Sequence, residues 1–169
     1  MVAVDVLFRA SYGVEARLLR KRPKAGRWTH VGMVFRDGWV FHCDARRGVC
    51  GELWPEFHGG GSRDLGRVIL PCSRPGENRL RSVCEDMAAR GLAFADDYCD
   101  WQESGQRFYC TTVICEVLAR AWGFVPLAPA AIPRQIVPLL GERRLLLPQQ
   151  LHDALVAQVG RTTGSGRRD

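Results

Sequence analysis

The sequence has no run of about 18 apolar residues, and Asp5 and Arg9 interrupt its first apolar stretch, MVAVDVLFRASYG. A membrane-spanning helix needs such a run, and a signal peptide needs an uncharged apolar segment, so neither is expected. The seven cysteines form no CxxC pair, and their odd number would leave one thiol over in an oxidised framework. A reducing compartment fits this usage better. We therefore expect a cytoplasmic location, with export by a dedicated system left open.

Motifs of several large enzyme classes are also missing. The chain contains no P-loop, GxGxxG, HExxH or GxSxG motif, so phosphate binding by a Gly-rich loop, zinc-peptidase chemistry and serine-hydrolase chemistry have no sequence support. His42, Cys43, Cys50 and His58 lie near one another in the sequence, but their spacings match no structural zinc pattern. We expect neither a metal nor an organic cofactor.

Positive charge is concentrated in two places. The formal net charge is +6, and much of it comes from residues 17–27, RLLRKRPKAGR, and from residues 161–169, RTTGSGRRD. Such a basic loop can attract phosphates or an anionic surface, although a solvated loop and a frayed tail are the simpler interpretation. No aromatic residue is interleaved with the basic run, so nucleic acid is not an expected partner. Peripheral contact with an anionic surface stays open.

The hydrophobic pattern predicts an α+β protein, with an antiparallel sheet packed by helices. A chain of 169 residues is expected to form a single domain, here residues 1–160, followed by a flexible basic tail at 161–169. Strands are predicted at 2–8, 29–35, 39–43, 48–54 and 66–71, and helices at 14–21, 75–91, 110–123 and 148–159. The Pro-punctuated segment 125–148 is expected to be irregular.

Cys110 is the first candidate for chemistry. It precedes the apolar positions Val113 and Ile114 and falls in the first turn of a predicted helix. The unpaired N–H groups and the helix dipole at that place favour a thiolate and can stabilise an oxyanion. However, free cysteine is among the most buried residue types, so position alone also fits a core thiol.

A cysteine nucleophile needs a base and a group that orients the base, and two histidines are suitably placed. His30 and His42 lie on the two strands of a predicted hairpin around Arg36-Asp37-Gly38. A two-residue turn would put the histidines on opposite faces. A three-residue loop with Gly38 in a G1 bulge instead places His42 opposite Gly32 and His30 diagonally beside it. The catalytic interpretation therefore requires the bulged hairpin.

The remaining candidates carry less chemistry. Tyr98 lies upstream of Cys110 in an acidic segment, and its hydroxyl can donate to a developing oxyanion, although a half-buried tyrosine is the commoner fate. His58, in a Gly-rich loop, and His152, in the last predicted helix, are both expected at the surface.

The order of these segments resembles the NlpC-type cysteine peptidases, and most closely their circularly permuted branch, the YiiX/YaeF/YebB-like hydrolases. The matching segments are DVLFR, THVGMV, WVFHC, FADDYCDWQESGQRFYC, the overlapping FYCTTV, and LLLPQQLHDAL, which together span roughly residues 4 to 156. Each motif is short, and only the set is specific. The resemblance implies a permuted papain-like fold.

The resemblance also implies roles for four residues: Cys110 as nucleophile, His30 as general base, His42 as orienting residue and Tyr98 as oxyanion donor. Two positions depart from the branch. It often has a glutamate where His42 stands, whereas a second histidine is typical of the unpermuted peptidases and of lecithin:retinol acyltransferase-like enzymes. The family often has Glu two residues after the cysteine, where this chain has Thr112.

Together these observations predict a thiol hydrolase that cleaves an amide bond, as in cell-wall-type peptides, through an acyl-enzyme. The expected partner is a peptide or acyl-lipid substrate, because the same residues can cleave or transfer a lipid acyl ester. A catalytically silent binding module on the same fold and a basic nucleic-acid binder are the alternatives from other classes. The substrate and the oligomeric state do not follow from the sequence.

Overall fold

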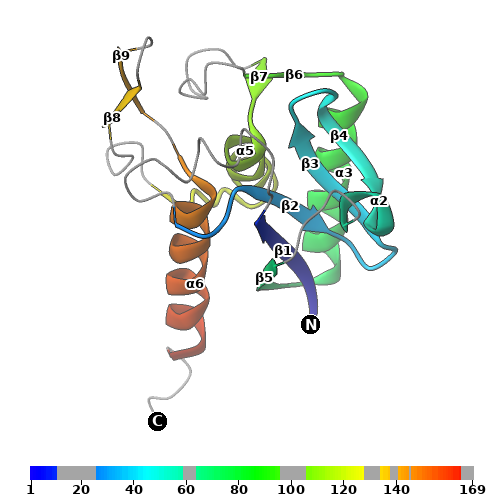
Figure 1. Cartoon of the computed structure of the whole chain (residues 1–169). Helices are drawn as coiled ribbons and strands as arrows, with labels where there is room; N and C mark the ends of the chain where they lie inside the picture. The colour runs from blue at the N-terminus through cyan, green and yellow to red at the C-terminus, as the bar shows by residue number, and fades with distance from the viewer. Residues whose placement is uncertain are drawn as a thin grey trace.

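A five-stranded antiparallel sheet with the order β4-β3-β2-β1-β5 forms the centre of the protein (Figure 1). The computed structural model describes residues 1–10, 26–58, 64–95, 106–127, 134–137, 141–144 and 146–164. The strands of the sheet are β1 (Val2–Ala10), β2 (His30–Val34), β3 (Trp39–Asp44), β4 (Gly48–Leu53) and β5 (Asp64–Cys72). The helices are α2 (Trp54–His58), α3 (Arg74–Ala89), α5 (Cys110–Trp122) and α6 (Pro148–Gly164). The predicted α+β class with an antiparallel sheet is confirmed.

Two short strand pairs lie outside this sheet. β6 (Ala93–Phe94) pairs in parallel with β7 (Arg107–Phe108), which leads directly into α5. β8 (Arg134–Val137) pairs antiparallel with β9 (Gly141–Arg144). The prediction that 125–148 is irregular is therefore wrong for these eight residues, because proline punctuation hides a short hairpin between the prolines.

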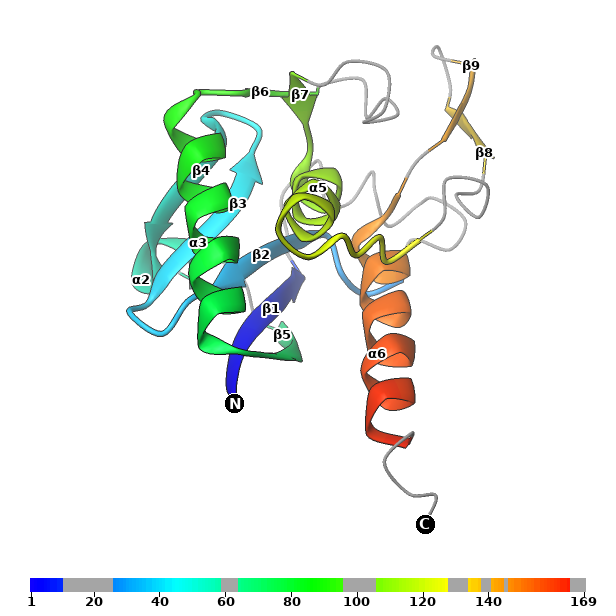
Figure 2. The same cartoon turned by 180° about the vertical axis from the view of Figure 1, so that it is seen from behind.

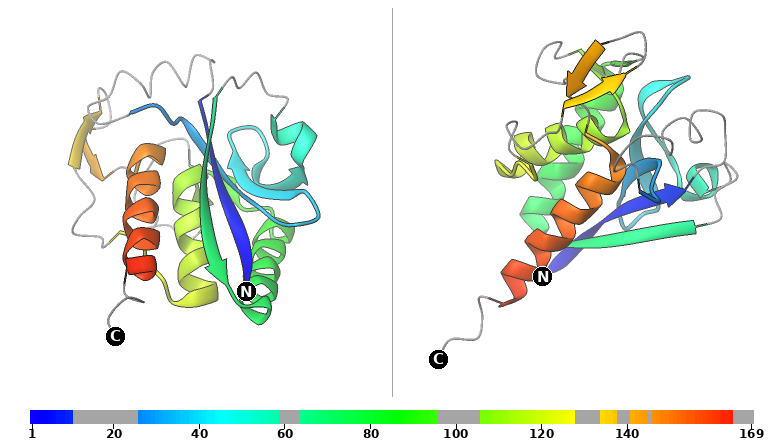
Figure 3. Two further views of the ribbon diagram at one scale, coloured as in Figure 1. Left: turned by 90° about the horizontal axis from the view of Figure 1, so that it is seen from below. Right: turned by 60° about the vertical axis from the view of Figure 1, so that its left-hand side comes forward.

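The alternation of side chains along the strands gives the sheet two different faces. One face joins a single core with α3, α5 and α6, and α3 and α5 lie in front of it in Figure 2. We call it the helix-covered face; its buried residues in the five strands are Val4, Val6, Phe8, Ala10, Val31, Met33, Phe41, Cys43, Val49, Val68 and Leu70. The opposite face, the site face, includes Leu7, Arg9, His30, Gly32, Val40, His42, Cys50 and Glu52. Figure 3 shows the helices α3, α5 and α6 on one side of the strands and α2 on the other.

The β2–β3 hairpin has the register that the bulged turn predicts. Gly38 has a φ of +79°, its N–H donates to Phe35 O, and the Phe35 N–H donates to Trp39 O. Gly32 is opposed to His42, which confirms the predicted pairing. Asp37 fixes the turn further, because its Oδ1 accepts the Trp39 N–H and its carboxylate pairs with Arg81 of α3.

The start of α5 is fixed by hydrogen bonds on both sides of Cys110. Tyr109 is the N-cap residue, and Thr112 Oγ1 accepts the Tyr109 N–H at 3.1 Å while donating to the Tyr109 carbonyl. The Tyr109 hydroxyl accepts the Leu146 N–H at 2.7 Å, which ties this turn to the segment that enters α6. Thr112 therefore caps the helix, and Cys110 is its first residue.

Several predicted boundaries change. The strand predicted at 48–54 ends at Leu53, and Trp54 begins α2, a five-residue helix too short for a periodic signal. The predicted helices at 75–91 and 110–123 are confirmed, with Gly91 and Gly123 at positive φ after their ends. α6 continues to Gly164, so the tail predicted at 161–169 begins as helix. The helix predicted at 14–21 lies outside the described residues. None of the helices in the described part of the chain is long and apolar enough to cross a membrane.

Candidate active site

His30 and His42 form a hydrogen-bonded pair on the site face. The distance from His30 Nε2 to His42 Nδ1 is 3.0 Å, and the rings are nearly perpendicular, at 85°. The pair forms because His42 is opposed to Gly32, which makes His30 its diagonal neighbour on the same face. The space beside Gly32 is filled by Phe57, because a Cβ at Gly32 would lie 2.9 Å from the Phe57 ring.

Glu52 extends this pair and was missed by the sequence analysis. Its Oε1 lies 2.9 Å from His42 Nε2, and its Oε2 lies 2.5 Å from the Arg47 guanidinium. His42 is opposed to Cys50 across β3 and β4, so Glu52, two residues further along β4, is on the same face. His42 is 1% exposed and Glu52 is 8% exposed, so this contact is closed to bulk water. The signal in the sequence was a lone carboxylate alternating with Cys50 in a short strand.

The three side chains allow one arrangement of protons when both rings are neutral. The Glu52 carboxylate only accepts, so His42 Nε2 carries the proton that it donates to Glu52. His42 Nδ1 is then an acceptor, and it takes the proton of His30 Nε2. His30 Nδ1 is left with a free lone pair, which is the atom that can act as a base.

Cys110 reaches the same end of β2 from the helix-covered face. β2 stops pairing with β3 at Gly32–His42, whereas β3 continues to pair with β4 as far as Asp44–Gly48. Where β2 and β3 part, Cys43 Sγ donates to Phe108 O at 3.0 Å, and the Val31 N–H hydrogen-bonds the Cys110 sulfur. That N–H belongs to the peptide bond between His30 and Val31, so the sulfur lies against the backbone that carries His30. No hydrogen bond joins Cys110 to the His30 ring within the described residues; the sulfur instead lies 3.8 Å from Thr111 Oγ1.

Burial favours the uncharged forms of Cys110 and His30. It raises the pKa of Cys110, an effect that the Thr111 hydroxyl, the Val31 N–H and the Arg9 charge oppose. It also lowers the pKa of His30 well below 6.5, and His42 and Arg9 act in the same direction. Burial lowers the pKa of His42 to about 4, and the nearby Glu52 offsets only part of this change. These directions disfavour the thiolate that the sequence analysis expected at Cys110 and favour a neutral thiol beside a neutral imidazole.

Arg9 is a second residue that the sequence analysis missed, because the strand was predicted to end at Phe8. β1 runs to Ala10, and Arg9 is opposed to His30 across β1 and β2. Its guanidinium lies 4.7 Å from the centre of the Phe57 ring and donates a short hydrogen bond to the Phe57 carbonyl. Phe57 also contacts both imidazoles, with ring centroids 5.7 Å from His30 and 5.2 Å from His42. The Phe57 ring therefore packs against His30, His42 and the Arg9 guanidinium.

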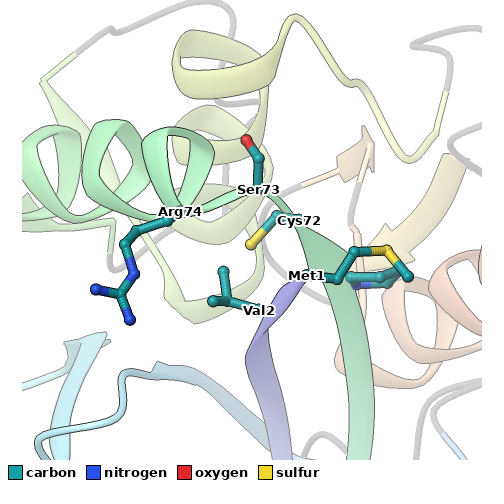
Figure 4. A pocket seen from close by; sticks show the side chains of 6 residues that line it. Met1, Val2, Cys72, Ser73 and Arg74 are labelled. Carbon is teal, nitrogen blue, oxygen red and sulfur yellow. The ribbon is translucent and has the colours of Figure 1, made fainter.

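His58 and His152 are not brought into this group. His58 is exposed at the end of α2, as expected. His152 is partly buried rather than at the surface, because its ring packs on Phe8 at 5.0 Å and on Trp28 at 5.8 Å. Tyr98 lies outside the described residues. A cavity of about 760 Å³ lined by Met1, Val2, Pro71, Cys72, Ser73 and Arg74 lies at the other end of β1 from Arg9 (Figure 4).

No family model matches the sequence, and no curated protein matches it. The structure is similar to the crystal structure of YiiX from Escherichia coli O157:H7, which is described as a metalloprotein, with a TM-score of 0.64 and 17% sequence identity. The match covers 88% of this chain and 90% of that chain. At this identity the likeness shows a shared fold and nothing about activity. The chain therefore has the fold of YiiX, an antiparallel five-stranded sheet packed by helices.

Proposed function

We propose that this protein is a thiol hydrolase that cleaves an amide bond through an acyl-enzyme on Cys110, and that its fold is the permuted papain-like fold of the NlpC type. The observation that carries the proposal is the chain of hydrogen bonds from Glu52 through His42 to His30, which ends beside the first turn of α5. A base oriented by a second group, next to a thiol at a helix start, is the arrangement that nucleophilic catalysis by cysteine requires.

In the proposed reaction, His30 Nδ1 removes the Cys110 proton as the sulfur attacks the carbonyl carbon. Free N–H groups in the first turn of α5 stabilise the oxyanion, and Tyr98 stays the predicted additional donor. His30 then gives the proton to the leaving amine, which departs and leaves a thioester. Water, deprotonated by His30, attacks the thioester and releases the acid, and the proton returns to the sulfur. His42 and Glu52 hold the His30 ring in the tautomer that exposes Nδ1.

The description of YiiX as a metalloprotein raises the question of whether this chain has a resident metal. In the part of the chain that the structure describes, no group of three or more His, Cys, Asp and Glu side chains can hold a metal ion. Both ring nitrogens of His42 are engaged, one by His30 and the other by Glu52. These residues do not fit a metal site, so no step of the proposed mechanism uses one.

Mass spectrometry of the intact protein tests the proposal. Incubation with an activated acyl peptide and, separately, with a phospholipid is expected to give an acyl adduct on Cys110 with one of them, and the adduct mass distinguishes an amide-type from a lipid acyl donor. Cys110→Ala is expected to lose the adduct and all turnover. Cys115→Ala is the matched control, because Cys115 is a buried thiol further along α5. An adduct that persists in Cys110→Ala contradicts the mechanism, and the absence of any adduct or turnover favours the silent binding module.

A further inference from the structure

The Arg9 guanidinium has unused hydrogen-bonding capacity next to the proposed base. Its one hydrogen bond within the described residues is the donation from NH1 to the Phe57 carbonyl. Its Nε atom is enclosed by protein and has no acceptor. A buried donor without an acceptor is costly, and such groups in native proteins are often satisfied by water, an ion or a ligand.

The charges around Arg9 are already matched by other residues. Glu52 is bonded to Arg47 and to His42, and Asp44 accepts the backbone N–H groups of Arg46 and Arg47. No carboxylate in the described part of the chain forms an ion pair with Arg9. Because burial favours uncharged Cys110 and His30, the Arg9 charge on this side of the site has no ion-pair partner among the residues that the structure describes.

We propose that Arg9 is the substrate-recognition residue of the site and binds an anionic group, a carboxylate or a phosphate, close to the bond that Cys110 attacks. This inference rests on the proposed function, since it assigns the substrate class of the same site. Arg9 is opposed to His30 on the adjacent strand, so a group bound by its guanidinium lies within a few ångströms of the His30 ring.

The free positions of the guanidinium determine how an oxyanion can bind. NH1 donates to the Phe57 carbonyl, and Nε has no acceptor but is enclosed by protein, so an oxyanion pairs with the Nε–NH2 edge by displacing the atoms that cover Nε. The Phe57 ring under the guanidinium and the Phe57 carbonyl fix its plane, so little side-chain freedom is lost on binding. A hydrogen bond to a charged group of this kind changes affinity by roughly tenfold to hundredfold.

Alkylation of Cys110 measures this preference without a known substrate. Iodoacetate and iodoacetamide have nearly the same size and the same reaction with a thiol, which forms a C–S bond and expels iodide, but only iodoacetate carries a carboxylate. The ratio of their rate constants at Cys110, from peptide mapping of the native protein, is expected to exceed the ratio in the urea-unfolded protein by about tenfold or more. Acetate and inorganic phosphate are then added as competitors. Stronger protection by acetate points to the carboxylate of a peptide, and stronger protection by phosphate points to a lipid head group.

Variants assign the preference to Arg9. Arg9→Gln is expected to lower the ratio to that of the unfolded protein, and Arg9→Lys to keep part of it. Arg67→Gln is the control, because Arg67 is opposed to Leu7 on the same face and pairs with Asp5 at 2.8 Å, and it is expected to keep the full ratio. Circular dichroism confirms that each variant is folded.

A native ratio equal to the unfolded one, a ratio that survives Arg9→Gln, or a Cys110 that iodoacetate does not label overturns the inference. The readout also separates this inference from the proposed function. A raised ratio in a protein that forms no acyl adduct contradicts the proposed hydrolase activity but supports the anion site at Arg9. Turnover of neutral substrates without a raised ratio supports the hydrolase activity and contradicts the anion site.

Discussion

The two faces of the sheet belong to the same strands and are buried to a similar extent, but different interactions stabilise them. On β3, Phe41 and Cys43 of the helix-covered face are fully buried, and His42 between them is 1% exposed. Burial therefore does not distinguish the faces; hydrogen bonding does. The helix-covered face gains stability from apolar area removed from water. The site face places a carboxylate and two imidazoles out of water, which is tolerable only because each bonds to the next.

If the proposed hydrolase activity is correct, we expect this division to let activity and stability be changed separately. Phe41 and most other side chains of the helix-covered face pack in the core and take no part in the hydrogen-bonded chain, although Cys110 packs in the same core. On the site face, Glu52, His42 and His30 form the hydrogen-bonded chain, whereas Leu7 and Val40 pack with Phe57 in a small apolar cluster. A substitution on the helix-covered face is therefore expected to lower stability more than activity, and a substitution in the hydrogen-bonded chain is expected to lower activity more than stability. The following predictions test that expectation.

The largest effect is expected for His30→Ala, with kcat/KM lowered by about 10³-fold to 10⁴-fold, or about 4 to 5 kcal/mol in the activation barrier, because the general base is lost. The substitution is expected to lower the free energy of unfolding by about 1 kcal/mol, because the buried His42 Nδ1 loses the hydrogen bond that His30 donates. Kinetics with the acyl donor found by mass spectrometry and urea titration measure the two quantities. His58→Ala, which changes an exposed histidine, is the control. Equal losses of activity in both variants would contradict the assignment.

Phe41→Ala should produce the reverse pattern. Phe41 is fully buried in the core between the sheet and the helices, and truncating a core phenylalanine costs about 3 to 5 kcal/mol in the free energy of unfolding. The folded fraction should keep its activity per molecule, measured as acyl adduct per folded protein. A Phe41→Ala protein that is stable but inactive would show that the helix-covered face takes part in the chemistry.

The difference between the faces also decides what could be predicted from the sequence. The His30–His42 pair was predictable because the register of a hairpin follows from local turn chemistry, here Asp37 and Gly38. Glu52 was not predictable in the same way. Its place depends on the β3–β4 register, which is set by the loop from Asp44 to Gly48, and that loop has no comparably specific turn signal.

Arg9 and α2 were missed for other reasons. The alternating sequence pattern of β1 predicts a strand that ends at Phe8. The strand continues to Ala10 because it pairs with β2 and β5 there. The helix α2 has five residues and gives no periodicity, yet its Phe57 contacts His30, His42 and Arg9. The helices α3 and α5 were predictable because the helix-covered face imposes a regular apolar stripe on long segments.

Acid is expected to lower the free energy of unfolding through the buried His42 of the site face. Unfolded histidine has a pKa near 6.5, and burial lowers the pKa of folded His42 to about 4. Between these values the unfolded chain binds a proton that the native ring does not, so stability present above pH 6.5 is lost as the pH falls toward 4. His42 contributes about 3 kcal/mol to this loss. Urea unfolding at pH 7, 5.5 and 4.5 is expected to show a smaller loss in His42→Gln than in the wild type; equal losses would mean that His42 is protonated in the native state.

Glu52→Gln is expected to have a moderate effect. The amide oxygen can still accept from His42 Nε2, but it brings no charge to stabilise the imidazolium pair during proton transfer, and it weakens the contact with Arg47. We expect kcat to fall by about 10-fold, with the KM nearly unchanged, because Glu52 acts through His42. A shift in the acidic limb of the pH–rate profile distinguishes this positioning role from a structural one. Glu56→Gln, which changes an exposed carboxylate of α2, is the control.

The smallest effect is expected at Gly38, and it connects the turn to the chemistry. Gly38 has a φ of +79°, and a Cβ there would meet nothing within 4 Å, so Gly38→Ala introduces only backbone strain of about 1 kcal/mol. Gly38→Asn should recover part of this stability, since asparagine tolerates the left-handed conformation better. If the bulge sets the pairing of Gly32 with His42, both variants should keep the same kcat when fully folded, because the strain is relieved by unfolding rather than by a change of register. A Gly38→Ala protein that stays folded but loses activity would show that the hairpin has slipped and that the turn controls where His42 points.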